Sequence, residues 1–247
     1  METSGYSSLL RRFPRFLRRL IDPHTEAIED FIREGAALVR KGGRVLDAGA
    51  GECPYKRLFP GSHYVGVDLA VGDRLWDYTA MDINADLLIL PFRDRTFDLA
   101  VNTQVLEHVR EPKAILTEIF RVLKPGGRLL LTAPQGWYEH QAPHDYFRFT
   151  SFALRYLLDC VGFTVEELKP MGGYFRYLGN RIGHLSKVLF PSRRALAWRI
   201  LFFPGELLAV FAFSGLVPMI LTTIDFLDRE RSFTLGYRCL ARRPGEA

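Results

Sequence analysis

The sequence predicts an α/β fold built on a doubly wound, mostly parallel β-sheet. From residue 42 onward, short β-rich runs alternate with helical periodicity, and the first two runs each end in a carboxylate, Asp47 and Asp68. The 247 residues are 48% hydrophobic and 25% charged, which is ordinary globular composition with ample material for a core. This composition excludes a disordered, collagenous or disulfide-scaffold chain.

The first expected element is a basic amphipathic helix. Apolar residues recur at helical spacing between residues 9 and 21, and the other face carries Arg11, Arg12, Arg15, Arg18 and Arg19. With Glu2 as the acidic residue of this segment, the first 20 residues hold +4 of the chain's net charge of +5. Because the charge is local, it suggests a surface anchor or tail rather than a nucleic-acid-binding body.

A second helix is expected to begin at Asp22-Pro23 and to run to about Arg40. Asp22 suits the N-cap and Pro23 the first helical position. Strands are then predicted at residues 44–47, 63–68, 97–101, 128–132, 163–168 and 233–241, with a helix at 114–123 and a turn at 124–127. We expect four regions: an N-terminal extension (1–41), a core (42–170), an apolar and basic insertion (171–232), and a last strand and tail (233–247).

The strongest local signal is a strand that runs directly into a glycine turn. Gly49 and Gly51 let the backbone turn sharply and approach a ligand, with the following amides expected to point into that space. A nicotinamide-dinucleotide fingerprint would need a third glycine where Pro54 stands. Asp68, at the tip of the next strand, can accept hydrogen bonds from two ribose hydroxyls. The pattern therefore predicts a nucleoside ligand.

Six ordered motifs over residues 43–134 resemble the class I S-adenosylmethionine-dependent methyltransferases, in the branch that includes the quinone-biosynthesis enzymes. The motifs are Asp47-Ala-Gly49-Ala-Gly51, Asp68, Asp86 to Phe92, Phe97-Asp98, Gln104 to Val109, and Arg121 to Gly127. The resemblance implies a seven-stranded Rossmann-like sheet with N-terminal helices and an apolar helical insertion before the last strand. It implies S-adenosyl-L-methionine as cofactor and an enzyme of EC class 2.1.1.

The same resemblance assigns cofactor-binding residues. It places Asp47, Gly49 and Gly51 at the methionine end, Asp68 with Leu69 at the ribose, Asp86 with Leu87 at the adenine, and Gln104 below the sulfonium. Methyl transfer needs mainly alignment, since the sulfonium is already an activated leaving group, but an acceptor hydroxyl or thiol also needs a base.

Candidate catalytic residues lie on the loop that follows the fourth predicted strand. In an open α/β sheet this loop lies at the carboxyl ends of the strands, where substrates bind. His140 and His144 titrate near neutral pH, and we expect His144 to act as base and Arg148 to clamp an anionic group. Alternatively, the histidines cap the loop and Asp145 pairs with Arg148. No metal site is expected, because no third ligand has suitable spacing to this histidine pair, and His108 is interpreted as structural.

Residues 207–224 form an uncharged stretch of 18 residues, the threshold length for a transmembrane helix. A single crossing would leave the last strand on the wrong side of the bilayer. The stretch must therefore double back, lie in the interface or pack on the domain, and Pro204 and Pro218 offer points to bend it. Residues 198–224, with aromatic residues at Trp198, Phe202, Phe203, Phe211 and Phe213, and the N-terminal helix together suggest an in-plane membrane anchor. A basic helix can equally be a solvated face packed on its own core.

The function expected from these observations is O-methylation of a small, lipid-linked or membrane-resident acceptor, such as a quinone precursor or a lipid-carried glycan. One alternative is a non-catalytic S-adenosylmethionine-binding module whose insertion recruits a partner. A weaker alternative is an RNA methyltransferase. Related enzymes that methylate nucleobase or amide nitrogens carry an Asn/Asp-Pro-Pro-aromatic motif, and its absence at Asn102 to Val105 disfavours nucleic acid as the acceptor. Three widely spaced cysteines and a broken N-terminal apolar run predict a cytoplasmic protein. The expected in-plane anchor would make it peripheral on the inner face of the cell membrane.

Overall fold

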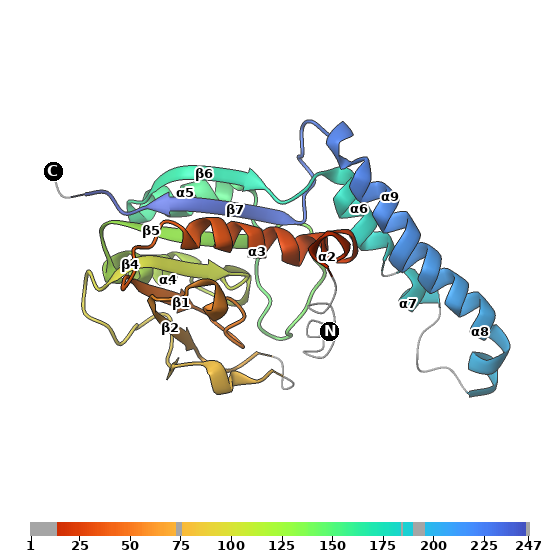
Figure 1. Cartoon of the computed structure of the whole chain (residues 1–247), viewed down its shortest axis with the longest axis horizontal. Coiled ribbons are helices and arrows are strands. Elements are labelled where there is room, and N and C mark those ends of the chain that lie inside the picture. Colours follow the sequence, from red (N-terminus) through yellow and green to blue (C-terminus); the bar gives the residue numbers. More distant parts are fainter. Residues whose placement is uncertain (1–13, 73–75, 184, 190–195, 246–247) are drawn as a thin grey trace.

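The computed structural model describes residues 14–72, 76–183, 185–189 and 196–245, and it forms one seven-stranded sheet (Figure 1). The strand order is β3-β2-β1-β4-β5-β7-β6. The strands are β1 (Arg44–Ala48), β2 (His63–Asp68), β3 (Ile83–Asn84), β4 (Phe97–Thr103), β5 (Leu123–Pro134), β6 (Thr164–Pro170) and β7 (Gly236–Arg242). Neighbours from β3 to β5 are parallel, and β7 is antiparallel to both β5 and β6. The predicted fold class is confirmed.

The strand order reverses between β1 and β4. The chain passes from β1 outward to β2 and β3, and it returns on the other side of β1 as β4. Asp47 near the end of β1 is paired with Gly66 on one side and with Val101 on the other. In open α/β sheets, ligands bind outside the carboxyl ends of the strands at such a reversal. The fold therefore places the glycine turn at the expected ligand crevice.

The two faces of the sheet are covered by different helices. Helix α3 (Pro23–Ala36) lies on one face with the short helix η1 (Lys56–Leu58), and α4 (Pro112–Val122) and α5 (Ser151–Val161) pack on the other. Alternate strand residues face each layer, as Val45 and Leu46 do. Gly35 lets α3 come close to the sheet, because a Cβ there would lie 2.2 Å from Leu130 Cδ1.

Most element boundaries follow local signals. Asp22 accepts a hydrogen bond from the Thr25 amide at 3.1 Å and Pro23 is the first residue of α3, although the helix ends at Ala36 rather than near residue 40. Strand β5 begins at Leu123 and includes the expected turn at 124–127, where Gly126 has φ +78°. The strand β3, the helix α5 and the short helices η2 (Tyr78–Ala80) and η3 (Leu106–His108) were not predicted.

The insertion forms a helical arm, which we define as the described part of residues 174–227. Helices α6 (Tyr174–Ile182) and α7 (Leu185–Leu189) lead outward, and α8 (Leu196–Phe211), the π-helical η4 (Ala212–Leu216), α9 (Val217–Thr223) and η5 (Asp225–Leu227) return to the sheet (Figure 1). The chain therefore doubles back, one of the three arrangements expected. Neither expected bend breaks the return path, since Pro204 lies inside α8 and Pro218 in the first turn of α9.

Close packing and a buried carboxylate hold the base of the arm. Helix α6 packs on α9, where a Cβ on Gly179 would lie 3.2 Å from Pro218 Cα. Asp225 is buried and accepts hydrogen bonds from the amides of Gly173 at 2.9 Å and Arg176 at 2.8 Å. These contacts join the arm to the turn that follows β6.

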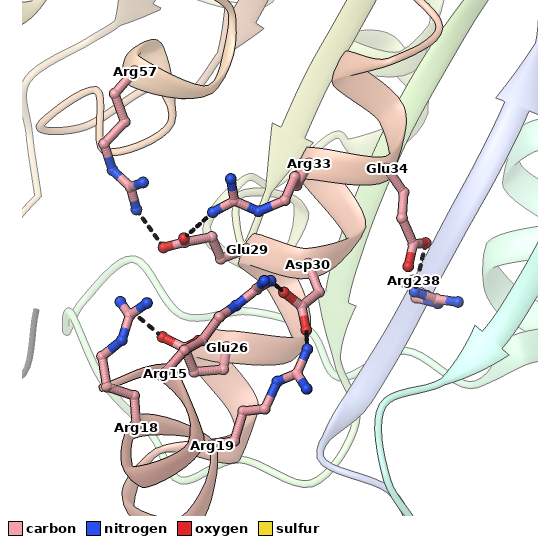
Figure 2. Close-up of polar contacts among 10 residues, drawn as sticks. All are labelled: Arg15, Arg18, Arg19, Glu26, Glu29, Asp30, Arg33, Glu34, Arg57 and Arg238. Atoms are coloured by element: carbon pink, nitrogen blue, oxygen red, sulfur yellow. Dashed lines mark hydrogen bonds and ion pairs between the residues drawn. The ribbon is translucent and has the colours of Figure 1, made fainter. Parts of the chain in front are cut away.

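Arg15, Arg18 and Arg19 of the first expected helix pair with acidic residues of α3 (Figure 2). Helix α2 (Arg15–Ile21) places Arg18 3.1 Å from Glu26 and Arg19 2.6 Å from Asp30, and Arg15 also contacts both carboxylates. Helix α3 thus supplies counter-charges to these three arginines, as expected for the alternative of a basic helix packed on its own core, and the membrane role of this helix stays a prediction. The earlier part of the predicted helix, residues 9–13, lies outside the described residues.

Candidate active site

The glycine turn after β1 requires glycine at its first position. Gly49 has φ +86°, and a Cβ there would lie 2.3 Å from Val105 Cγ2, so any side chain would be strained and would clash. The amides of Gly49 and Ala50 donate to the Val67 carbonyl at 2.8 and 3.0 Å. The Gly51 amide donates to Asp68 Oδ2 at 2.9 Å. These three amides therefore close the turn, and the expectation that the amides following the glycines face a ligand stays a prediction.

The Asp68 carboxylate is held at the tip of β2 by two backbone amides. Its Oδ2 accepts from Gly51, and its Oδ1 accepts from Ala70 at 2.8 Å. Each carboxylate oxygen retains capacity for a further hydrogen bond, so the group can still accept ribose hydroxyls. Leu69 beside it is exposed. The ring of Trp76, which sequence reasoning missed, lies 3.3 Å from the position of a Cβ on Gly51.

Asp47 is a buried carboxylate with an unsatisfied oxygen. Its Oδ2 accepts a hydrogen bond from the Tyr64 hydroxyl, whereas Oδ1 has no hydrogen-bond partner within the described part of the chain. Burial raises the pKa of Asp47 to about 7, against the opposing effect of the Tyr64 hydrogen bond. An unpartnered carboxylate oxygen beside the glycine turn is suited to a ligand that brings a cationic N–H group.

The predicted adenine contacts follow β3. The Ala85 amide donates to the Asp68 carbonyl at 3.1 Å, which keeps this segment next to the end of β2. Asp86 is exposed and its Oδ1 accepts from the Leu88 amide at 2.9 Å. Leu87 is buried in the core layer that carries α4. Asp86 therefore lies near Asp68, while Leu87 is mainly a packing residue.

Gln104 follows β4 in a left-handed conformation with φ +54°, which is uncommon for a residue other than glycine and occurs often at functional sites. Its amide donates to the Thr132 carbonyl at 3.0 Å, and its side-chain Nε2 donates to Thr132 Oγ1 at 3.1 Å. These two bonds fix the side chain above the junction of β4 and β5.

His24, in the first turn of α3, lies beside Gln104. Its ring stacks on Trp137 with a centroid distance of 5.1 Å, and Nδ1 lacks a hydrogen-bond partner among the described residues. Burial lowers the pKa of His24, with the Asp22 charge and a hydrogen bond to Gln104 acting in the opposite direction. The ring is therefore neutral near pH 7. Sequence reasoning missed His24, because only the packing of α3 brings it to residue 104.

The guanidinium of Arg181, on α6, covers the aromatic side of this region. It lies 4.9 Å from the ring centroid of Trp137 and 5.6 Å from that of Tyr138. Arg181 thereby links the arm to the loop after β5. The loop aromatics and His24 form one layer that borders Gln104.

Arg148 does not have the free donors that an anion clamp needs. It donates to both oxygens of Asp145 and to the carbonyls of Trp137, Tyr138 and Phe147, which uses all five of its N–H groups. Burial alone would raise the pKa of Asp145, but the hydrogen bonds from Arg148 and from the His140 amide, together with the charge of Arg148, outweigh burial and hold that pKa at about 2. The alternative in which Asp145 pairs with Arg148 is the arrangement observed.

The two loop histidines differ in their surroundings. His140 is partly buried, its backbone amide donates to Asp145 Oδ2 at 2.8 Å, and its ring Nδ1 lies 3.1 Å from the Tyr138 carbonyl. His144 is exposed, and its Nδ1 lies 3.2 Å from the Tyr146 hydroxyl. An oriented base needs a second group that holds its ring, so His140 fits such a role better than His144.

Glu107 and His108, at the end of β4, come together with His140. Glu107 is fully buried, and burial raises its pKa to about 8. His108 Nε2 lies 3.7 Å from Glu107 Oε1, and the His108 ring is edge-on to that of His140 at 4.6 Å. One ligand atom from each of the three residues lies within 4.8 Å of the others. The sequence analysis considered only the pair His140 and His144 as ligands, whereas the fold groups His140 with residues 107 and 108, which are distant from it in the sequence.

Known proteins are similar in sequence to the central part of the chain. Residues 46–131 match the family described as "Methyltransferase domain". An uncharacterized methyltransferase from Mycobacterium tuberculosis (strain ATCC 25177 / H37Ra) is 32% identical over 129 residues, covering 47% of this chain and 50% of that protein. Demethylmenaquinone methyltransferase from Clavibacter sepedonicus is 38% identical over 99 residues, covering 36% of this chain and 40% of that protein. The chain spans about half the length of the curated relatives it matches.

A solved structure shows the same fold. The 1,6-didemethyltoxoflavin-N1-methyltransferase of Burkholderia thailandensis, with bound 1,6-didemethyltoxoflavin and S-adenosylhomocysteine, matches with a TM-score of 0.52 at 18% identity. The match covers 99% of this chain and 91% of that one. At this identity the similarity concerns the fold and not the acceptor.

Proposed function

We propose that this chain, which carries a class I S-adenosylmethionine-dependent methyltransferase domain, transfers a methyl group to an acceptor bound beside Gln104. The observation that carries the proposal is the arrangement at the strand-order reversal. There, the constrained turn at Gly49, the orphaned oxygen of Asp47 and the amide-held carboxylate of Asp68 lie together. The two carboxylates can accept hydrogen bonds from the amino group and from the ribose hydroxyls of S-adenosylmethionine, and the glycine turn leaves room between them.

The residues present fit this cofactor. Asp47 Oδ1 would accept from the amino group of the methionine end, and Asp68 from the ribose hydroxyls. Gly49 and Gly51 keep Cβ atoms out of the approach to the turn. When bound, the cofactor supplies an activated methyl group on its sulfonium. The protein's part is to hold this group in line with the acceptor and to exclude water.

The proposed acceptor atom is a hydroxyl oxygen, and His24 is the proposed base. His24 is neutral, lies beside Gln104, and has a ring nitrogen that no described residue partners. A neutral imidazole within hydrogen-bond reach of a hydroxyl can take its proton during transfer. Exposed His144, the base expected from sequence, has no carboxylate among its hydrogen-bond partners in the described region.

The proposed acceptor is lipid-linked or membrane-resident. Within the segment Phe203–Leu227, the most apolar window of 18 residues has a mean hydropathy of 2.2, and 6% of that window is buried. Its exposed large apolar side chains are Phe203, Leu207, Leu208, Val210, Phe211, Leu216, Met219, Ile220, Phe226 and Leu227. An apolar surface of this extent favours contact with a membrane.

The connection of the arm to the site supports this acceptor class. Both ends of the arm join strands of one sheet, β6 and β7, so the arm would enter the membrane interface from one side only. Arg181 on its first helix contacts the aromatic layer beside Gln104. The name of the Clavibacter relative, demethylmenaquinone methyltransferase, is in line with an isoprenoid quinone precursor, and a lipid-carried glycan is the other candidate. The proposed location is cytoplasmic and peripheral, through the arm rather than through α2.

Calorimetry with S-adenosylmethionine and its demethylated product tests the cofactor assignment. The wild-type chain is expected to bind both, and Asp68→Ala is expected to lose most of the affinity. Asp94→Ala removes an exposed carboxylate that pairs with Arg121 on the surface, and it should bind as the wild type does. Equal affinity of Asp68→Ala and wild type would overturn the assignment.

Methyl transfer is tested by incubating the protein with methyl-labelled cofactor and membrane lipid extracts. Label in the lipid fraction, identified by mass spectrometry, would support the proposal. Cofactor binding with no transfer to any lipid, glycan or RNA fraction would instead indicate the non-catalytic binding module.

A further inference from the structure

We propose that Glu107, His108 and His140 bind one divalent transition-metal ion, with zinc the best match to their chemistry. A ligand atom from each side chain lies within 4.8 Å of the other two. Glu107 and His108 come from η3 after β4, and His140 from the loop after β5.

The first observation is a group of buried polar atoms without partners. Glu107 is 0% exposed, and neither of its carboxylate oxygens has a hydrogen-bond partner in the described structure. The Nε2 atom of His108 is also buried and unpartnered there. Burying such groups without a partner costs free energy, so native proteins satisfy them with protein, water or metal. A cation bound by these atoms would satisfy all three at once.

The second observation concerns the other nitrogen of each imidazole. His108 Nδ1 lies 2.6 Å from the His144 carbonyl, and His140 Nδ1 lies 3.1 Å from the Tyr138 carbonyl and 3.3 Å from Asp145 Oδ2. Each Nδ1–H can therefore donate to an oxygen, which leaves Nε2 as the lone-pair atom. Histidine ligands of metals are commonly oriented in this way by a carbonyl or a carboxylate.

The ligand types and the distance between the Glu107 and His108 side chains suit zinc. Two ligands about 2.1 Å from a tetrahedral zinc ion lie about 3.4 Å apart, close to the 3.7 Å between His108 Nε2 and Glu107 Oε1. Two imidazoles with one carboxylate also favour zinc over magnesium or calcium, which prefer oxygen ligands. The nearby positive charge of Arg148 is compensated by its paired hydrogen bonds to Asp145.

Three protein ligands would leave a fourth position for a water molecule or for an oxygen of the acceptor. A role of the metal in binding the acceptor rests on the proposed function, because the methyl acceptor would have to bind near the carboxyl ends of β4 and β5. Metal binding by the three side chains does not depend on it.

The test measures zinc bound to the full-length chain. Protein stripped with a chelator is dialysed against zinc chloride, and bound zinc is quantified by mass spectrometry and by competition with a fluorescent zinc indicator. The wild type is expected to bind one zinc ion per chain. Glu107→Gln, His108→Ala and His140→Ala should each weaken zinc binding by more than about tenfold. The matched control is His63→Ala, which removes an exposed histidine at the start of β2.

Several results would overturn the proposal: no zinc on the wild type, wild-type affinity in all three variants, or an equal loss in His63→Ala. Glu107→Gln keeps the shape of the buried side chain, so it reports on ligation even if an alanine variant fails to fold. Circular dichroism of each variant checks folding. Calorimetry with S-adenosylmethionine on the same samples separates the two proposals, since zinc binding without cofactor binding contradicts only the proposed function.

Discussion

The Asp145 carboxylate accepts two hydrogen bonds from the guanidinium of Arg148, each 2.7 Å long. The remaining Arg148 donors bind backbone carbonyls, including those of Trp137 and Tyr138. The pair of Asp145 and Arg148 therefore stabilises the conformation of the loop after β5. It holds the aromatic layer and His140 in place, since the His140 amide also donates to Asp145.

Weakening the hydrogen bonds between Arg148 and Asp145 should lower the stability of the protein more than its affinity for the acceptor. Arg148→Lys keeps the charge but cannot form the paired hydrogen bonds, and we expect a loss of about 1–3 kcal/mol in the free energy of unfolding. Scanning calorimetry would show a melting temperature lower by several degrees. An unchanged melting temperature with a raised KM for the acceptor would instead support the anion clamp expected from sequence.

Gly49→Ala should impair both folding and cofactor binding. It introduces a Cβ 2.3 Å from Val105 Cγ2 at φ +86°, and we expect a destabilisation of about 1–3 kcal/mol with weaker binding of S-adenosylmethionine. Gly126→Ala is the control, because its φ is +78° but a Cβ there meets nothing within 4 Å. The difference between the two variants, by chemical denaturation and calorimetry, isolates the clash. Equal effects would show that only backbone strain matters.

Asp47→Asn should stabilise the cofactor-free protein in a pH-dependent manner. Burial raises the pKa of Asp47 to about 7, above the usual 3.8, so the folded state binds the proton more tightly than the unfolded state. The stability of the wild type therefore falls as pH rises from about 4 to about 7, and the asparagine variant lacks this contribution. Denaturation at pH 5 and pH 8 should show a larger gain for the variant at pH 8. The same variant should bind S-adenosylmethionine more weakly. A gain in the free energy of unfolding that is the same at pH 5 and pH 8 would refute the raised pKa of Asp47.

His24→Asn should lower kcat by about 10²- to 10⁴-fold if His24 is the base. Burial lowers the pKa of His24, so the ring stays neutral and kcat should hold to a pH below the usual value of 6.5 before it declines. Steady-state kinetics across pH measures both effects, with His63→Ala as the control. A comparable loss in His144→Ala and not in His24→Asn would restore the base expected from sequence.

Charged residues on the arm should reduce membrane binding. Leu207→Glu combined with Leu208→Glu places two charges on the exposed apolar face of α8, where these side chains are 60% and 68% exposed. We expect most of the binding to liposomes to be lost in a sedimentation assay, because buried charge is costly in the membrane interior. Phe152→Glu changes an 82% exposed residue on α5 and should leave binding intact. Equal binding by all three proteins would contradict the membrane proposal.

The sequence by itself determined the elements whose signals are local. Alternating strands, the Asp22 N-cap and the glycine turn at Gly49 depend on residues a few positions apart, and each was predicted near its observed place. The positions of Asp47 and Asp68 near the ends of β1 and β2 were predicted for the same reason, and their binding of the cofactor stays a prediction.

Only the tertiary structure decided which distant side chains meet. The acidic face of α3 pairs with Arg18 and Arg19, and the packing of α3 on the sheet brings His24 to Gln104. The crossover from β4 to β5 brings Glu107 to His140. Periodicity and capping describe interactions within a few residues of the chain, whereas these contacts depend on how helices cross the sheet. The grouping of His24 with Gln104 and of Glu107 with His140 therefore could not be predicted from motifs, because these residues become neighbours only through packing.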